Sequence, residues 1–268
     1  MRRWLFSVMA MELRKILAYR SDFWVTFLGQ VLIQIFIAHA LWQAVFAAND
    51  TQTMNGFTLS KMTLYYVIVA VGGRILTGEN IGFISREIYE GTFSRYLIYP
   101  LSAFHYKATT YLTYSLFYSS QLILIYFIYR LGFTESIPTL TEAGLLLLGT
   151  FLFLCSALVY VLMVMMIELL ALWADNIWSL IVMLRFFSTF LGGGLLPLTF
   201  FPDWAQGVLG YLPFPYYLSL PARTVLGDTS FAEIGYGLGI LALWGLFFAG
   251  AVALIWRSGQ KQYTGVGV

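Results

Sequence analysis

The chain has 268 residues, of which 60% are hydrophobic, 18% are aromatic and only 10% are charged. With a mean hydropathy of +0.78, this much apolar surface cannot be buried in a soluble core of the same length, so the composition predicts an all-α integral membrane protein. The net charge of +2 is too small to indicate a nucleic-acid partner. The single cysteine, Cys155, lies in an apolar run and cannot form an internal disulfide.

The first segment, residues 1–20, predicts an interfacial helix that lies on the membrane. Its apolar residues share one arc of a helical wheel, opposite Arg3 and Ser7: Leu5, Phe6, Met9, Leu13, Ile16 and Leu17. A signal peptide is not expected, because Glu12, Arg14 and Lys15 interrupt the apolar run and no small-residue cleavage site follows.

Six apolar segments approach the length of roughly 20 residues that a helix needs to cross the hydrocarbon core. These predicted spans lie near 22–47, 61–78, 107–130, 143–172, 177–200 and 233–256. With the N-terminus inside, the cytoplasmic segments collect Arg2, Arg3, Arg14, Lys15, Arg20, Arg86, Arg95, Lys107, Arg257 and Lys261, whereas the outer segments hold Lys61, Arg130 and Arg223. The positive-inside rule therefore predicts that both termini are cytoplasmic.

Between the second and third predicted spans lies a charged, aromatic segment, residues 79–106, which we call the coupling segment. Ile84, Ile88 and Tyr89 recur at helical spacing. The charged residues Arg86, Glu87, Glu90 and Arg95 fall largely elsewhere around the helix. Such an amphipathic element either rests on the lipid headgroups or binds a partner. Two acidic side chains are unfavourable beside anionic headgroups, which favours the partner.

A second unusual region extends from the glycine triplet at 192–194 into residues 201–228. Five of the seven prolines fall between Pro197 and Pro221, so the fifth span is expected to break near its outer end. The residues that follow are apolar and aromatic but too interrupted to span. They predict short re-entrant helices on the outer side, or an amphipathic loop at the headgroups.

Polar side chains inside the apolar segments are candidates for function. Glu168 and Arg185 have comparable expected depths in adjacent antiparallel spans, so they are a candidate ion pair, and Arg74 lies in a third span. Either a packing clamp or a substrate contact would explain such charges. Gln30 and Gln34 share one face of the first span, where they either join helices or line a path.

The sequence does not indicate a catalytic site. The two histidines, His39 and His105, lie far apart in expected depth, so no metal site is predicted. No phosphate-loop motif occurs, so the chain is not expected to be an enzyme that hydrolyses ATP. A proton-coupled secondary transporter that uses Glu168 and the intramembrane arginines is an alternative, but no inverted repeat is evident.

The order of these parts resembles the membrane (permease) subunit of an ATP-binding-cassette exporter of the second type. The first set of features is the motif Arg86-Glu87-Ile88-x-x-Gly91-Thr92, followed by Leu97-x-x-Pro100-Leu101-Ser102. The second is the run Gly193-Gly194-Leu-Leu-Pro197, Phe201-Pro202-x-Trp204 and Tyr211-Leu212-Pro213. The resemblance covers nearly the whole chain, and its tail from Trp256 to Gly267 is similar to that of a bacterial branch.

The resemblance implies that the coupling segment sits in a groove of a separate ATPase. Ile88, Tyr89 and Phe93 would form its apolar anchor. Arg86, Glu87, Glu90 and Arg95 would form a polar rim, with Gly91 at the end of the helix. ATP and Mg would be bound by two partner ATPase subunits, and no cofactor is expected in this chain.

The resemblance also implies a cargo path at the interface of two permeases, identical or related, in a bacterial inner membrane. Gln30 and Gln34 would lie near this interface. The outer gate would comprise Gly192, Gly193, Gly194, Pro197, Phe201, Pro202, Trp204 and Pro213. The aromatic content suits an amphiphilic cargo, and lipid-like, drug-like and glycan substrates stay open.

Overall fold

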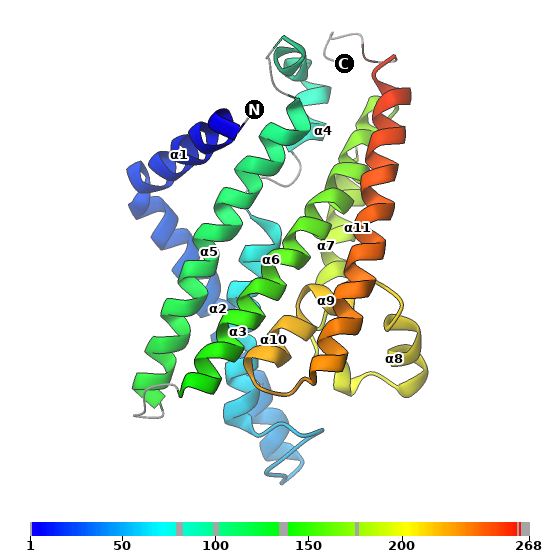
Figure 1. The fold of residues 1–268 in the computed structure, drawn as a ribbon. Helices are drawn as coiled ribbons and strands as arrows, with labels where there is room; N and C mark the ends of the chain where they lie inside the picture. The colour runs from blue at the N-terminus through cyan, green and yellow to red at the C-terminus, as the bar shows by residue number, and fades with distance from the viewer. Residues whose placement is uncertain are drawn as a thin grey trace.

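The computed structural model describes residues 2–78, 83–98, 102–133, 139–174, 177–261 and 263. In these ranges the regular elements are all helices, which confirms the all-α prediction (Figure 1). The long helices are α1 (Arg2–Ala18), α2 (Arg20–Ala48), α3 (Leu59–Thr77), α5 (Ala103–Phe133), α6 (Leu140–Glu168), α7 (Trp178–Leu191) and α11 (Phe231–Gly259). The short ones are α4 (Phe83–Tyr89), η1 (Thr92–Leu97), η2 (Leu169–Leu172), η3 (Leu198–Phe200), α8 (Asp203–Leu209), α9 (Phe214–Tyr217) and α10 (Ser219–Val225).

Five helices of the described chain, α2, α3, α5, α6 and α11, are long and apolar enough to cross a membrane. The span expected near 177–200 is shorter than predicted, because its helix α7 has 14 residues and ends at Leu191. At 1.5 Å per residue this is about 21 Å, against a hydrocarbon core of about 30 Å. The chain turns at the glycine triplet, so hydropathy alone overestimated this helix.

The two ends of the helical bundle carry different elements (Figure 1). The start of α1, the short helix α4 and the end of α11 lie at one end. Helices α8, α9 and α10 lie toward the other end, together with the connection from α2 to α3. The coupling segment and the proline-rich region are therefore on opposite sides of the bundle, as the alternation of the predicted spans requires.

Helix α1 is oblique to the bundle and packs one face on α5 (Figure 1). Val8, Glu12 and Ile16, spaced four residues apart, are buried on that face. Phe6 and Leu17 remain 69% and 60% exposed. An exposed apolar side on a helix at the end of the bundle is what contact with the membrane interface requires.

Helix α3 is the centre of the bundle, since it packs on α2, α5, α6 and α10. Tyr65, Val71 and Ile75 on this helix are fully buried. Small residues allow the helices to approach closely: a Cβ atom on Gly72 would lie 2.3 Å from the ring of Phe153 on α6. Close contact through glycine is a common way for helices to pack in an apolar solvent.

We expect Gly149→Ala to destabilise the protein by about 1–3 kcal/mol through overpacking of α6 against α10. An added Cβ would lie 2.4 Å from Cγ2 of Val225 and 2.9 Å from the carbonyl oxygen of Pro221. Thermal unfolding of the detergent-solubilised protein measures the effect. Gly144→Ala, on the same helix but with no described atom within 4 Å, is the matched control. It should leave the stability unchanged or raise it by up to about 1 kcal/mol. Equal effects of the two changes would contradict the packing.

Candidate coupling and translocation sites

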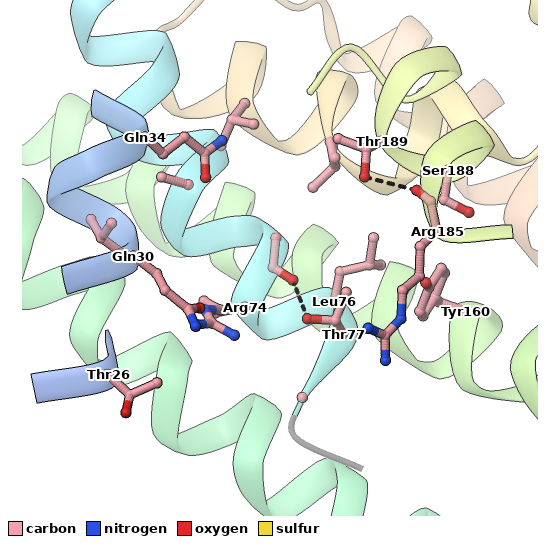
Figure 2. A pocket seen from close by; sticks show the side chains of 16 residues that line it. Thr26, Gln30, Gln34, Arg74, Leu76, Thr77, Tyr160, Arg185, Ser188 and Thr189 are labelled. Carbon is pink, nitrogen blue, oxygen red and sulfur yellow. Dashed lines mark hydrogen bonds between the residues drawn. The ribbon is translucent and has the colours of Figure 1, made fainter. Parts of the chain in front are cut away.

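A cavity of about 500 Å³ lies among α2, α3, α6 and α7. Its polar wall includes Gln30 and Gln34 from α2, Arg74 from α3 and Arg185 from α7 (Figure 2). The structure thus brings both predicted glutamines together with two of the three predicted intramembrane charges. The remainder of the lining is Thr26, Val31, Val69, Ala70, Gly73, Leu76, Thr77, Gly78, Tyr160, Ser188, Thr189 and Leu218.

Helical geometry places these side chains. Gln30 and Gln34 are one turn apart on α2, and Arg185 and Thr189 are one turn apart on α7. The hydroxyl of Thr189 donates to the Arg185 carbonyl at 2.9 Å, as the dashed line in Figure 2 shows. The hydroxyl of Thr77 likewise donates to the carbonyl of Gly73 at 2.9 Å. Both threonines thereby satisfy their hydroxyls within their own helices, which leaves the amides and guanidinium groups as the main polar groups that face the cavity.

The ion pair of Glu168 with Arg185 stays a prediction. Glu168 is 1% exposed, and its carboxylate accepts a hydrogen bond of 2.8 Å from the backbone N–H of Ile84. Ile84 is the second residue of α4, so the carboxylate caps the first turn of that helix, where backbone donors are otherwise unsatisfied.

The coupling segment contains a buried cluster of charge around Glu87. Its carboxylate accepts from Nζ of Lys107 at 2.9 Å, from the hydroxyl of Tyr96 at 3.0 Å and from the Arg95 guanidinium. Glu87 is 7% exposed, so it is a structural residue of the permease and not part of the polar rim that was expected. Burial, followed by the charge of Glu87, raises the pKa of Tyr96 to about 12, so the phenol remains a donor at physiological pH.

The expected apolar anchor is also largely internal. Ile88 and Phe93 are 6% and 0% exposed, whereas Tyr89 is 49% exposed. The Phe93 ring packs against the rings of Trp256 and Tyr263, with centroids 5.8 and 5.9 Å apart. The Tyr263 hydroxyl donates to the Gly91 carbonyl at 3.1 Å. The apolar side of this segment therefore packs on Trp256 of α11 and on Tyr263, which lies beyond the end of that helix. Both residues are about 160 to 170 positions from Phe93 in the chain.

The exposed side chains of residues 84–90 are one aromatic and two charged groups. Arg86 on α4 and Glu90, the residue after this helix, form an exposed ion pair at 2.7 Å. Tyr89 lies between them in sequence. We call Arg86, Tyr89 and Glu90 the exposed edge of the coupling segment. The guanidinium of Arg95 is half-exposed and pairs with Glu87.

The proline-rich region is held to α3 by two tyrosines. Tyr65 donates to the Gly193 carbonyl at 2.7 Å, and Tyr66 donates to the Leu195 carbonyl at 2.8 Å. Gly193 has φ +84°, a left-handed conformation that favours glycine. These bonds satisfy backbone acceptors of the turn that follows α7.

The residues expected at the outer gate lie at the turn after α7 and around α8 and α9. Gly192 caps the C-terminus of α7, Pro197 precedes η3, Pro202 precedes α8 and Pro213 precedes α9. Phe201, Pro202 and Trp204 line an apolar cavity of about 500 Å³ with residues of α7 and α8. Trp204 is 76% exposed. Helices α9 and α10 are instead buried in the bundle. Helix α9 packs on α6 and α7, and α10 packs on α6 and α3.

Sequence reasoning missed three ion pairs toward this end of the bundle. Lys61 pairs with Asp228 at 2.7 Å, Arg130 with Glu142 at 2.7 Å, and Arg223 with Glu233 at 2.6 Å. All six residues stand near helix ends. The partners are 167, 12 and 10 residues apart in sequence, so only the fold shows their pairing. A usable local signal existed for Glu142, which completes a capping box with Thr139.

Comparison with known families agrees with this architecture. Residues 24–267 match the family model described as ABC-2 family transporter protein. The match spans most of the chain, and the chain therefore belongs to the ABC-2 transporter family, as a multi-pass permease whose relatives act with ATP-binding-cassette ATPases. No curated protein and no solved structure matches the chain.

We expect Glu87→Gln to destabilise the permease by about 3 kcal/mol, because it leaves the largely buried Lys107 without its carboxylate. Thermal unfolding of the solubilised chain measures this loss. Glu90→Gln is the matched control: its pair with Arg86 is exposed to solvent, so its loss should change the stability little. A Glu87 variant as stable as the Glu90 variant would show that the buried cluster does not hold the coupling segment.

Proposed function

We propose that this chain is the permease subunit of an exporter that is driven by separate ATP-binding-cassette ATPases. The observation that carries the proposal is the attachment of α4 and η1 to three membrane helices. Glu87 joins them to Lys107 on α5, and Glu168 at the end of α6 holds the first turn of α4. Phe93 packs on Trp256 of α11.

These attachments supply what energy transfer through a partner needs. A subunit without a phosphate loop has to receive work mechanically, through an element that is rigid toward its own helices and open toward the partner. The inner face of α4 and η1 is buried, and the exposed edge at Arg86, Tyr89 and Glu90 is accessible. ATP and Mg belong, in this proposal, to two ATPase subunits, and the exposed edge faces them from the cytoplasm of a bacterial cell.

The proton-coupled alternative has less support. Such a transporter needs an acidic group that faces the path, and no aspartate or glutamate is among the described residues that line the cavity. Glu168 is engaged with the backbone of α4. A permease that works with ATPases requires no such group.

We expect Tyr89→Ala to abolish binding of the ATPase while the permease stays folded, because Tyr89 is the large apolar side chain of the exposed edge. The permease is purified from its native membrane, and co-purified ATP-binding-cassette ATPases are identified by mass spectrometry. Ile88→Ala is unsuitable for this test, since Ile88 is buried and its loss would affect folding.

Tyr211→Ala is the matched control, because Tyr211 is 70% exposed and follows α8, near the opposite end of the bundle. This variant should retain the ATPase. If the Tyr89 variant retained it equally well, the exposed edge would not be the docking surface.

The path is proposed to run along the interface of two permeases, identical or related. Helix α2 carries large exposed apolar residues such as Val25 and Phe36, so much of it is free to meet lipid or a second copy. Gln30 and Gln34 line the cavity beside it. In this cavity an amphiphilic cargo would contact both an apolar wall and a polar wall.

In a Cys155→Ala background, cysteines at Gln30 or Gln34 are expected to cross-link permease to permease, and ATP should change the yield if the interface opens and closes. Denaturing gels of cross-linked membranes report the dimer. A cysteine at Leu124, an exposed residue of α5, is the matched control and should give little product. Efficient cross-linking at Leu124 alone would place the interface elsewhere.

A further inference from the structure

The cavity among α2, α3, α6 and α7 has an unequal distribution of charge. Arg74 and Arg185 both line it, from two different helices, and none of its described lining residues is acidic. Figure 2 shows the two arginine side chains on opposite sides of the space, with Gln30 on the side of Arg74. Each guanidinium group has five N–H donors, so two of them at one cavity can offer several hydrogen bonds to a ligand.

Additional hydrogen-bonding groups surround these cations. Gln30 and Gln34 each offer two amide donors. Ser188, on the same face of α7, is 2% exposed. Its hydroxyl lies next to Tyr160 but has no hydrogen-bond partner of good geometry in the described chain. A buried hydroxyl at the cavity wall is one more group that a ligand oxygen would satisfy.

The rest of the wall is apolar. Val31, Val69, Ala70 and Leu218 come from α2, α3 and the region between α9 and α10. A site that combines two planar guanidinium groups with an aliphatic wall suits an anionic headgroup attached to a hydrocarbon. Guanidinium groups bind phosphate and carboxylate through paired hydrogen bonds.

We propose that this cavity binds the phosphate or carboxylate headgroup of an anionic amphiphile, with Arg74 and Arg185 as its cationic contacts. The proposal rests on the proposed function in that it assigns the substrate class of the same path. Its ligand contacts are the two guanidinium groups and the Gln30 and Gln34 amides, and its apolar wall covers the start of the hydrocarbon chain.

The test measures binding of dodecyl phosphate to the purified, delipidated chain in detergent by native mass spectrometry. Dodecyltrimethylammonium, with the same tail and the opposite charge, is the comparison ligand. Dodecyl phosphate should bind at least about tenfold more tightly, which corresponds to about 1.4 kcal/mol. Equal binding of the two amphiphiles would overturn the proposal.

Arg74→Gln and Arg185→Gln should each weaken dodecyl phosphate binding about tenfold. Arg74→Lys and Arg185→Lys should keep most of it, since a cation remains, and they separate loss of charge from loss of folding. Arg257→Gln is the matched control, because Arg257 is exposed near the end of α11 and lines no part of this cavity. Unchanged affinity in both glutamine variants would overturn the assignment of these residues.

Competition identifies the source of the headgroup. Displacement of dodecyl phosphate by phosphatidylglycerol but not by phosphatidylethanolamine supports a bulk membrane lipid as a ligand. Resistance to both supports a dedicated cargo. Inorganic phosphate that competes as well as dodecyl phosphate would overturn the requirement for an amphiphile. Because the assay contains no ATPase, its result is independent of whether Tyr89 binds one.

Discussion

The main constraint on this structure is that backbone groups at membrane depth must find partners inside the protein. Helix α7 ends after 14 residues, and the chain beyond it turns within the bundle. Tyr65 and Tyr66 donate to the carbonyls of Gly193 and Leu195, and the Ser156 hydroxyl donates to the carbonyl of Tyr216 at 2.6 Å. With these bonds α3 and α6 position the short helices and, through them, the wall of the cavity that α7 supplies.

The same rule applies to charge. Glu87 and Glu168 are buried, and each is used to attach α4 to another element, through Lys107 in one case and the Ile84 amide in the other. Arg74 and Arg185, on α3 and α7, line the cavity. Buried carboxylates therefore hold α4 in place, and two cations line the cavity.

Composition and periodicity predicted the all-helical membrane fold, an amphipathic helical element within residues 79–106 and the break at the glycine triplet. They did not predict which face of that short helix is accessible. Periodicity shows that Ile88 lies on an apolar side, but Trp256 and Tyr263 come from the far end of the chain to cover Phe93 beside it. Gln30, Gln34, Arg74 and Arg185 were visible in the sequence because amides and charges are rare in spans, whereas Tyr160, Ser188 and the threonines of the lining were not singled out. Their convergence depended on helix orientation, which the sequence pattern leaves open.

The cavity and the coupling segment meet at the end of α3. Arg74 lies in the last turn of that helix, and its carbonyl accepts from the N–H of Gly78 at 2.9 Å. Only residues 79–82 separate Gly78, a left-handed glycine with φ +53°, from the start of α4. A displacement of α4 by an ATPase would therefore act first on the turn that carries Arg74. Because coupling between two binding sites is reciprocal, an anion held by Arg74 would in turn favour one position of α4, so that cargo in the cavity would influence how the exposed edge engages the ATPase.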